Sequence, residues 1–226
     1  METKLFNVLI VEDHPMTLEM FVMFFKTVED QRPDWKFNIK TGDCCESAIY
    51  ALKNHAPVEG YDLIFLDYRM PPSSDGKYVS GEDVAVYIRE RFPKSKILFI
   101  TSSHDTVIKS VLKNINPEGF LIKAETTPEI LLRAVIEILL GGSYYGKSAH
   151  KIMRLPFETD LILDEWDRKL LYELNRGTKT THIPNILPLS LSSVARRKRR
   201  LKEIFEVEGD GDGELLARAR ELGFIG

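Results

Sequence analysis

Short apolar runs alternate with stretches of helical periodicity through the first two thirds of the chain. We predict strands over 6–12, 36–41, 62–67, 96–101 and 118–123. We predict helices between them over 15–29, 44–55, 81–91, 105–114 and 127–140. Continuous apolar strands are typical of parallel sheets that are buried on both faces, and strand–helix alternation is typical of βαβ units. The fold class predicted for this part is therefore α/β.

Polar residues follow four of these strands directly, at the carboxyl end of each. In chain order they are Glu12 and Asp13, then Asp67, then Thr101, then Lys123. In an open α/β sheet the carboxyl ends of the strands meet at one edge, where ligands bind. A polar residue can end a strand by coincidence, but four coincidences of complementary chemistry are improbable. We therefore expect these side chains to converge on one site.

The residue types at this edge suit a divalent cation and a phosphoryl group. Glu12, Asp13 and Asp67 offer the carboxylate oxygens that Mg²⁺ prefers. A carboxylate can also attack phosphorus, and Asp67 is the candidate because it follows the most apolar strand. A cation such as Lys123 can hold an oxygen of the transferred group. Thr101 can donate a hydrogen bond to another oxygen.

These motifs resemble those of the receiver domains of two-component response regulators. The matching segments are Val11-Glu-Asp-His-Pro15, Leu66-Asp-Tyr-Arg-Met-Pro71, Thr101-Ser102 and Phe120-Leu-Ile-Lys123. The resemblance implies a flavodoxin-like (βα)5 fold that is phosphorylated on Asp67 by a sensor histidine kinase or a phosphotransfer protein. It implies Mg²⁺ held by Glu12, Asp13, Asp67 and the backbone carbonyl of Arg69.

The same resemblance assigns roles to Thr101, Phe120 and Lys123. Thr101 and Lys123 would contact the phosphoryl group, and the ring of Phe120 would turn inward once Thr101 moves. The chain would then be a phospho-acceptor regulator rather than an enzyme, limited to Mg²⁺-dependent self-phosphotransfer and slow autodephosphorylation. One departure is visible: the glycine after Met-Pro is Gly81, displaced by an insertion of about six residues around 72–79.

The remaining residues predict helices only. In chain order we expect a helix between Asp164 and Gly177, a short segment near 180–187, a helix over 191–205 and a last helix over 214–222. Asp164 and Ser190 are candidate N-caps. The region 151–226 is nearly neutral, with 14 basic and 13 acidic residues, but its positive charge is concentrated. Six of the seven residues of Arg196–Lys202 are basic.

This layout resembles the LuxR/NarL-type helix-turn-helix output domain. The resemblance implies a DNA-recognition helix that directs Ala195, Arg196 and Arg199 at base edges, because arginine pairs bidentately with guanine. The implied phosphate contacts are Arg197, Lys198, Arg200 and Lys202. Pro184 falls within the expected scaffold helix and is expected to shorten it. The acidic loop 208–214 lies close to the basic helix in sequence.

The predicted domains are a receiver over 1–142, a linker over 143–160 and a helix-turn-helix domain over 161–226. We interpret the chain as a response regulator that binds double-stranded DNA, controls transcription and forms a homodimer on phosphorylation. One alternative is an output domain that binds only protein. The other is a phosphohydrolase of the haloacid dehalogenase type, but such enzymes need an acid two residues after the nucleophile, where Arg69 stands.

The composition favours the cytoplasm. We find no apolar stretch long enough to span a membrane and no signal peptide at the amino end. The two cysteines, Cys44 and Cys45, are adjacent and cannot plausibly form a structural disulfide with each other. We expect them instead to begin a helix.

Overall fold

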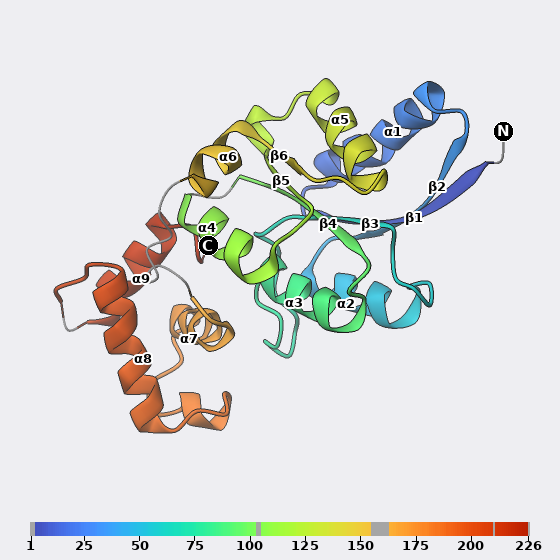
Figure 1. Ribbon diagram of the computed structural model, residues 1–226. Coiled ribbons are helices and arrows are strands. Elements are labelled where there is room, and N and C mark those ends of the chain that lie inside the picture. Colours follow the sequence, from blue (N-terminus) through green and yellow to red (C-terminus); the bar gives the residue numbers. More distant parts are fainter. Residues whose placement is uncertain (1–2, 103–104, 155–162, 210, 226) are drawn as a thin grey trace. The chain divides into compact units, whose positions relative to one another are not determined.

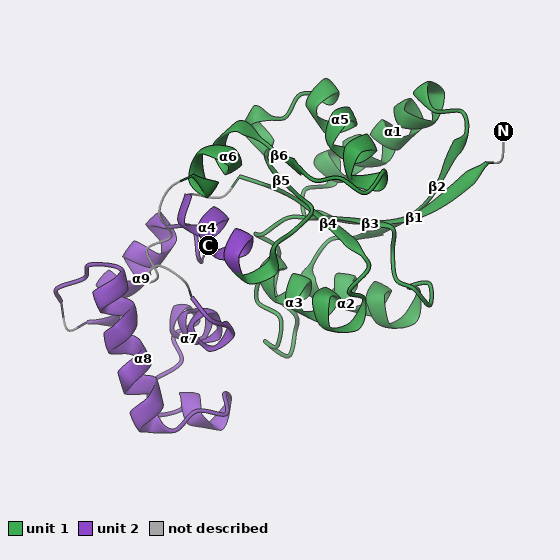
Figure 2. Ribbon diagram, viewed as in Figure 1, with its two compact units in different colours: residues 1–102, 114–154 green, residues 103–113, 155–226 purple. Residues whose placement is uncertain are grey.

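The computed structural model describes residues 3–102, 105–154, 163–209 and 211–225. The chain divides into two compact units, which Figure 2 colours separately. The first comprises residues 1–102 and 114–154, and the second comprises residues 103–113 and 155–226. Helix α4 (Asp105–Ile115) lies within the predicted receiver, 1–142, and the division between the two sets of residues falls inside it.

The first unit is built on a parallel sheet. Within the described residues its strands are β1 (Lys4–Val11), β2 (Trp35–Gly42), β3 (Leu63–Leu66), β4 (Lys96–Thr101), β5 (Gly119–Ile122) and β6 (Tyr144–Tyr145). They lie in the order β2-β1-β3-β4-β5-β6. The five strands predicted from sequence are confirmed to within two residues at each end. The short strand β6 was not predicted.

Helices cover both faces of this sheet, which is why its strands are continuous apolar runs. Helices α1 (Pro15–Gln31) and α5 (Pro128–Leu139) lie on one face, and α2 (Cys45–Asn54) and α3 (Gly81–Arg91) lie on the other (Figure 1). All four residues of β3 are buried. Phe21 and Phe25 of α1 contact Phe65 of β3 edge to face or tilted, with ring centroids 5.4 and 5.3 Å apart.

Local capping explains where the helices begin. His14 precedes α1, and Pro15 occupies its first position. The Cys44 thiol accepts a hydrogen bond from Ser47 N at the start of α2, which confirms the prediction that the cysteines begin a helix. The Thr127 hydroxyl caps α5 in the same way.

Part of the segment predicted as a linker is ordered structure of the first unit. Tyr144 of β6 pairs with Gly119 of β5, and helix α6 (Lys147–Met153) follows. Ala149 and Ile152 of α6 are buried. Residues 155–160 of the predicted linker, and the first two residues of the predicted output domain, lie outside the described residues.

The second unit is helical in its described residues after Leu163. Its elements are α7 (Glu165–Asn175), a 3₁₀ turn η3 (Ile183–Asn185), α8 (Leu191–Ile204) and α9 (Asp212–Glu221). Asp164 and Ser190 cap α7 and α8, as predicted. The expected scaffold helix is reduced to η3, which contains Pro184. Because proline lacks a backbone donor, this shortening has a direct physical cause.

The unit is held by a small apolar core between its helices. Leu170 and Leu171 of α7, Val194 and Leu201 of α8, and Leu215 of α9 are fully buried. Across both units, the helices within the described ranges are too short or too polar to cross a membrane.

Candidate functional sites

Three of the predicted residues meet at the carboxyl edge of the sheet in the first unit. Lys123 Nζ lies 2.6 Å from Asp67 Oδ2 and 2.7 Å from Glu12 Oε2. Glu12 is 1% exposed and Asp67 is 5% exposed, so both carboxylates need this cation. Burial alone would lower the pKa of Lys123, but the charge of Asp67 and the hydrogen bonds to both carboxylates outweigh burial and raise it.

Thr101 and Phe120 belong to two neighbouring strands, β4 and β5. Thr101 is the last residue of β4 and is fully buried. Phe120 on β5 is also fully buried, and its ring stacks on that of Phe99, with centroids 5.8 Å apart. The sequence led us to expect a ring that turns inward on activation; in this structure the ring of Phe120 already lies inside.

The acidic pair offers a place for a metal ion. Glu12, Asp13 and His14 each present one ligand atom, and these atoms lie within 4.8 Å of one another. Oxygen donors of this kind suit Mg²⁺. His14 was not among the predicted metal ligands; its Nδ1 lies 2.8 Å from Asp13 Oδ1. That hydrogen bond and the charge of Asp13 raise the pKa of His14.

Asp67 belongs to the predicted ligand set, but both of its carboxylate oxygens accept hydrogen bonds from other groups. Its Oδ2 accepts from Lys123, and its Oδ1 accepts from the backbone N–H of Arg69 at 3.3 Å. The residues present nevertheless fit a hard cation, since buried Glu12 and half-buried Asp13 directly follow β1, whose last residue, Val11, pairs with Leu66 directly before Asp67. The assignment of Glu12, Asp13, Asp67 and the Arg69 carbonyl as the complete ligand set stays a prediction.

The inserted segment that follows Asp67 is closed on itself and tied to α2. Ser73 N donates to Tyr78 O at 2.9 Å, and Ser74 Oγ donates to Glu46 Oε1 at 2.9 Å. Beyond the insertion, Gly81 N donates to Tyr68 O at 2.8 Å. A Cβ on Gly81 would lie only 1.9 Å from the Asp67 carbonyl oxygen. The insertion thus leaves this glycine against the backbone of Asp67.

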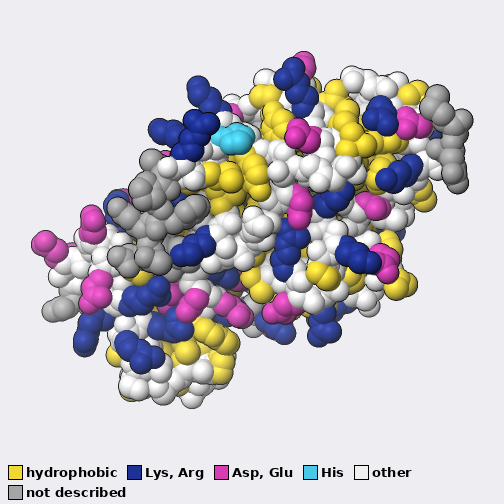
Figure 3. Space-filling model, in the orientation of Figure 1, with side chains coloured by type: hydrophobic (Ala, Val, Ile, Leu, Met, Phe, Trp, Pro, Cys, Tyr) yellow, Lys and Arg dark blue, Asp and Glu magenta, His cyan; other side chains and the backbone are white. Residues whose placement is uncertain are grey.

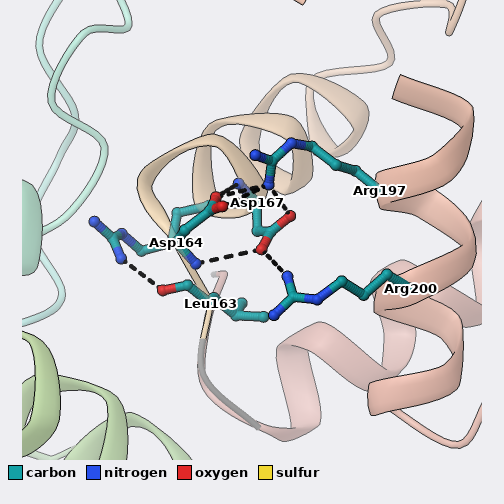
Figure 4. Close-up of polar contacts among 6 residues, drawn as sticks. Leu163, Asp164, Asp167, Arg197 and Arg200 are labelled. Atoms are coloured by element: carbon teal, nitrogen blue, oxygen red, sulfur yellow. Dashed lines mark hydrogen bonds and ion pairs between the residues drawn. The ribbon is translucent and has the colours of Figure 1, made fainter. Parts of the chain in front are cut away.

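In the second unit the basic helix α8 is bound to the start of α7. Arg197 Nη1 lies 2.7 Å from oxygens of both Asp164 and Asp167, and Arg200 also pairs with Asp167 (Figure 4). Asp167 is fully buried. Burial alone would raise the pKa of Asp164, but the hydrogen bond from Arg197 and the backbone bond at Asp167 lower it. The sequence identified Asp164 only as a cap.

Two further cations of α8 hold the acidic loop that follows it. Lys198 Nζ lies 2.6 Å from Asp212 Oδ1, and Lys202 Nζ donates to Gly209 O at 2.9 Å. By contrast, Arg196 and Arg199 are exposed, and neither has an ion pair with another described residue. Of the predicted DNA contacts, these two side chains therefore remain the most available to a ligand.

Comparison with known proteins agrees with the geometry of the first unit. A family model described as "Response regulator receiver domain" matches residues 8–135, which is more than half of the chain. The buried Asp67, the acidic pair Glu12 and Asp13, and Lys123 all lie within the matched residues. The chain belongs to the response regulator receiver family and is not a conventional enzyme.

Full-length relatives extend the similarity into the second unit. The chain is 23% identical over 207 residues to the transcriptional regulatory protein RcsB of Escherichia coli K12, covering 90% of each chain. It is 23% identical over 235 residues to the transcriptional activator protein ExaE of Pseudomonas putida, covering 97% of this chain and 98% of that one. A solved structure of RcsB from Salmonella enterica serovar Typhimurium, bound to promoter rprA with the phosphomimetic BeF3⁻, has a TM-score of 0.64 at 20% identity. It covers 95% of this chain and 98% of that one, and shows that the fold is shared.

Proposed function

We propose that this response regulator is phosphorylated on Asp67, and that phosphorylation controls transcription through binding of α8 to double-stranded DNA. The observation that carries the first half is the contact of Lys123 with Asp67 beside buried Glu12. A carboxylate that is buried yet stays in an ion pair at the rim of the sheet is a suitable nucleophile for phosphorus.

The donor would be the phosphohistidine of a sensor kinase or phosphotransfer protein. An oxygen of Asp67 attacks phosphorus, the bond from phosphorus to the histidine nitrogen breaks, and an acyl phosphate forms. Mg²⁺, held by Glu12, Asp13, Asp67 and the Arg69 carbonyl, would neutralise charge on the phosphoryl oxygens. Lys123 then moves from the carboxylate to a phosphoryl oxygen, and Thr101 donates a hydrogen bond to another. The same residues support only Mg²⁺-dependent self-phosphotransfer and slow autodephosphorylation.

The second half of the proposal rests on α8 and on the relatives. RcsB–DNA complexes have the same fold as this chain. We propose Arg196 and Arg199 as the base-reading side chains, because both are exposed. Arg197, Lys198, Arg200 and Lys202 complete the proposed phosphate contacts. Because Arg197 and Lys198 already pair with carboxylates, we expect each to contribute less than an unpaired cation.

The proposed sequence of events runs from Asp67 to DNA through association of two chains. Phosphorylation draws Thr101 toward the phosphoryl group and fixes Phe120 inside, which repacks the adjoining surface. A homodimer then presents two α8 helices to paired half-sites. We place this activity in the cytoplasm.

The experiment is labelling and DNA selection with one pair of variants. Asp67→Asn keeps the shape of the side chain but removes the nucleophile, so it should abolish Mg²⁺-dependent formation of acyl phosphate and phosphorylation-dependent enrichment of duplexes from a random pool. Asp13→Asn should weaken metal binding and slow labelling. Asp30→Asn is the control, since Asp30 is exposed on α1. Undiminished labelling of the Asp67 variant would refute the proposal.

An output domain that binds protein alone is a second candidate. It is favoured by the pairing of Arg197 and Lys198 inside the unit, which reduces the charge that α8 offers to phosphate. Binding to duplex DNA that weakens steeply as salt rises would decide against this candidate.

A further inference from the structure

Helix α6 has a cationic surface to which the proposed function assigns no role. Lys147, His150, Lys151 and Arg154 are exposed, and their spacing of three to four residues puts them on one side of the helix. Figure 3 shows Lys and Arg side chains and a His gathered over the position of α6. None of these four side chains forms an ion pair within the described ranges of the chain.

The surface is held rigidly on the first unit. Gly146 N donates to Phe120 O at 2.9 Å, directly before α6 begins. Ala149 is fully buried and Ile152 is 2% exposed, so the opposite side of the helix packs inward. The neighbouring acid, Glu125, accepts hydrogen bonds from the backbone and hydroxyl of Ser148. The helix that carries the cations is therefore fixed in position, and among the described residues Glu125 forms no ion pair with them.

We propose that α6 is a second DNA-contacting element, which binds the phosphate backbone beside the site that α8 reads. This inference rests on the proposed function of α8. From Lys147 to Arg154 the helix rises roughly 10 Å, at about 1.5 Å per residue. That length matches about three successive phosphates of one strand, which are spaced about 3.4 Å along the duplex axis.

The length of the chain between α6 and the helices of the second unit supports the same partner. Residues 155–162 separate Arg154 from Leu163. A fully extended segment of this length spans at most roughly 30 Å. With α8 on DNA, a span of this length keeps α6 within reach of the same duplex, which raises its effective concentration there.

The buried face of α6 argues against a membrane as the partner. A helix that lies on a bilayer inserts its apolar side between the lipids. The apolar side of α6 is already used, because Ala149 and Ile152 pack into the first unit. Apart from Met153, the large side chains that α6 exposes are cationic or histidine, and such a surface suits the phosphates of a duplex.

The test compares two triple variants of the full chain on two duplexes. The first variant is Lys147→Gln with Lys151→Gln and Arg154→Gln. The control is Lys26→Gln with Lys40→Gln and Lys53→Gln, which makes the same charge change at exposed lysines elsewhere in the first unit. One duplex carries the selected site alone; the other carries it within about 15 base pairs of flanking sequence on each side. Affinity is measured at several salt concentrations, and the urea midpoint of each variant is compared with wild type.

We expect the α6 variant to lose affinity on the long duplex only. Its salt slope there should fall by about 0.9 for each lost phosphate contact, or about 2 to 3 in all, whereas the control should match wild type. Equal slopes for the α6 variant and wild type would overturn the inference, as would an equal loss in the control. Binding to phosphatidylserine vesicles that the α6 variant alone loses, with duplex binding unchanged, would overturn it in favour of a membrane.

The design separates this inference from the proposed function. If wild type binds no duplex, the proposed function of α8 fails. If Arg199→Ala weakens binding on both duplexes and the α6 variant behaves as wild type, only the role of α6 fails.

Discussion

Replacing Gly81 by alanine would force a methyl group against the backbone of Asp67, the proposed acceptor residue. The new Cβ would lie 1.9 Å from Asp67 O and 2.9 Å from Asp67 C. Ordinary contact begins at 3.4 Å, so the two segments must separate by about 1.5 Å. Neither can move freely, because Gly81 N donates to Tyr68 O and Asp67 N donates to Val11 O.

We expect two measurable effects of this Gly81→Ala change. Overpacking costs about 1–3 kcal/mol, and the loss of one backbone hydrogen bond adds about 1 kcal/mol, so the free energy of unfolding should fall by about 2–4 kcal/mol. A displacement of about 1 Å at a reacting group can cost about 100-fold in rate. Phosphorylation by a small phosphodonor should slow by about that factor.

The assay is urea unfolding together with a time course of acyl phosphate formation in Mg²⁺. Gly213→Ala is the matched control, since Gly213 also lies in the first turn of a helix and nothing surrounds its added Cβ within 4 Å. The control should be unchanged or more stable by about 0.4–1 kcal/mol. If Gly81→Ala unfolds and labels as wild type does, the packing of Gly81 against Asp67 affects neither stability nor phosphorylation, and the prediction is wrong.

Three further predictions concern the charges described above. Lys123→Met leaves two buried carboxylates without their cation, so the free energy of unfolding should fall by about 3 kcal/mol, the lower end for a broken buried pair because Lys123 is 20% exposed. Light scattering with beryllofluoride should detect no dimer of this variant, and association equal to that of wild type would contradict a role of Lys123 in activation. The pKa of His14 is raised by Asp13, so the stabilising effect of this contact should be complete below pH 6.5 and disappear as pH rises through the folded pKa. An NMR titration of His14 should have its midpoint above pH 6.5, and Mg²⁺ should lower that midpoint; a midpoint at 6.5 would refute the contact. Arg196→Ala and Arg199→Ala should each reduce discrimination between bases by about 1–3 kcal/mol, whereas Arg200→Ala and Lys202→Ala should weaken binding to all duplexes alike. Identical nonspecific losses in titrations of all four variants would remove the case for base reading.

The meeting of Glu12, Asp67 and Lys123 could be predicted from sequence because it follows from the topology of the sheet. Parallel strands in one sheet have their carboxyl ends at the same edge, so the residues after β1, β3 and β5 had to be neighbours. The positions of the five longer strands could also be predicted, since strands buried on both faces are continuous apolar runs. Strand β6 escaped because two residues, Tyr144 and Tyr145, are too few to show a period.

The partners of the basic helix could not be predicted in the same way. Asp164 and Asp167 have the spacing of a capping box, which accounts fully for both residues within α7. Their second role, binding Arg197 and Arg200, depends on how α7 packs against α8. Sequence spacing describes neighbours along one helix, whereas these ion pairs join residues about thirty positions apart.

The insertion after Asp67 is held by hydrogen bonds at both of its ends. One anchor precedes it, where Asp67 N bonds to Val11 O, and another follows it, where Gly81 N bonds to Tyr68 O. Between these anchors the segment closes through its own Ser73–Tyr78 bond. Loop length adds little entropic cost once both ends are fixed. An epitope or a fluorescent reporter placed between Asp75 and Gly76 should therefore leave the acceptor working, which makes this turn the natural point of attachment for following the protein in living cells.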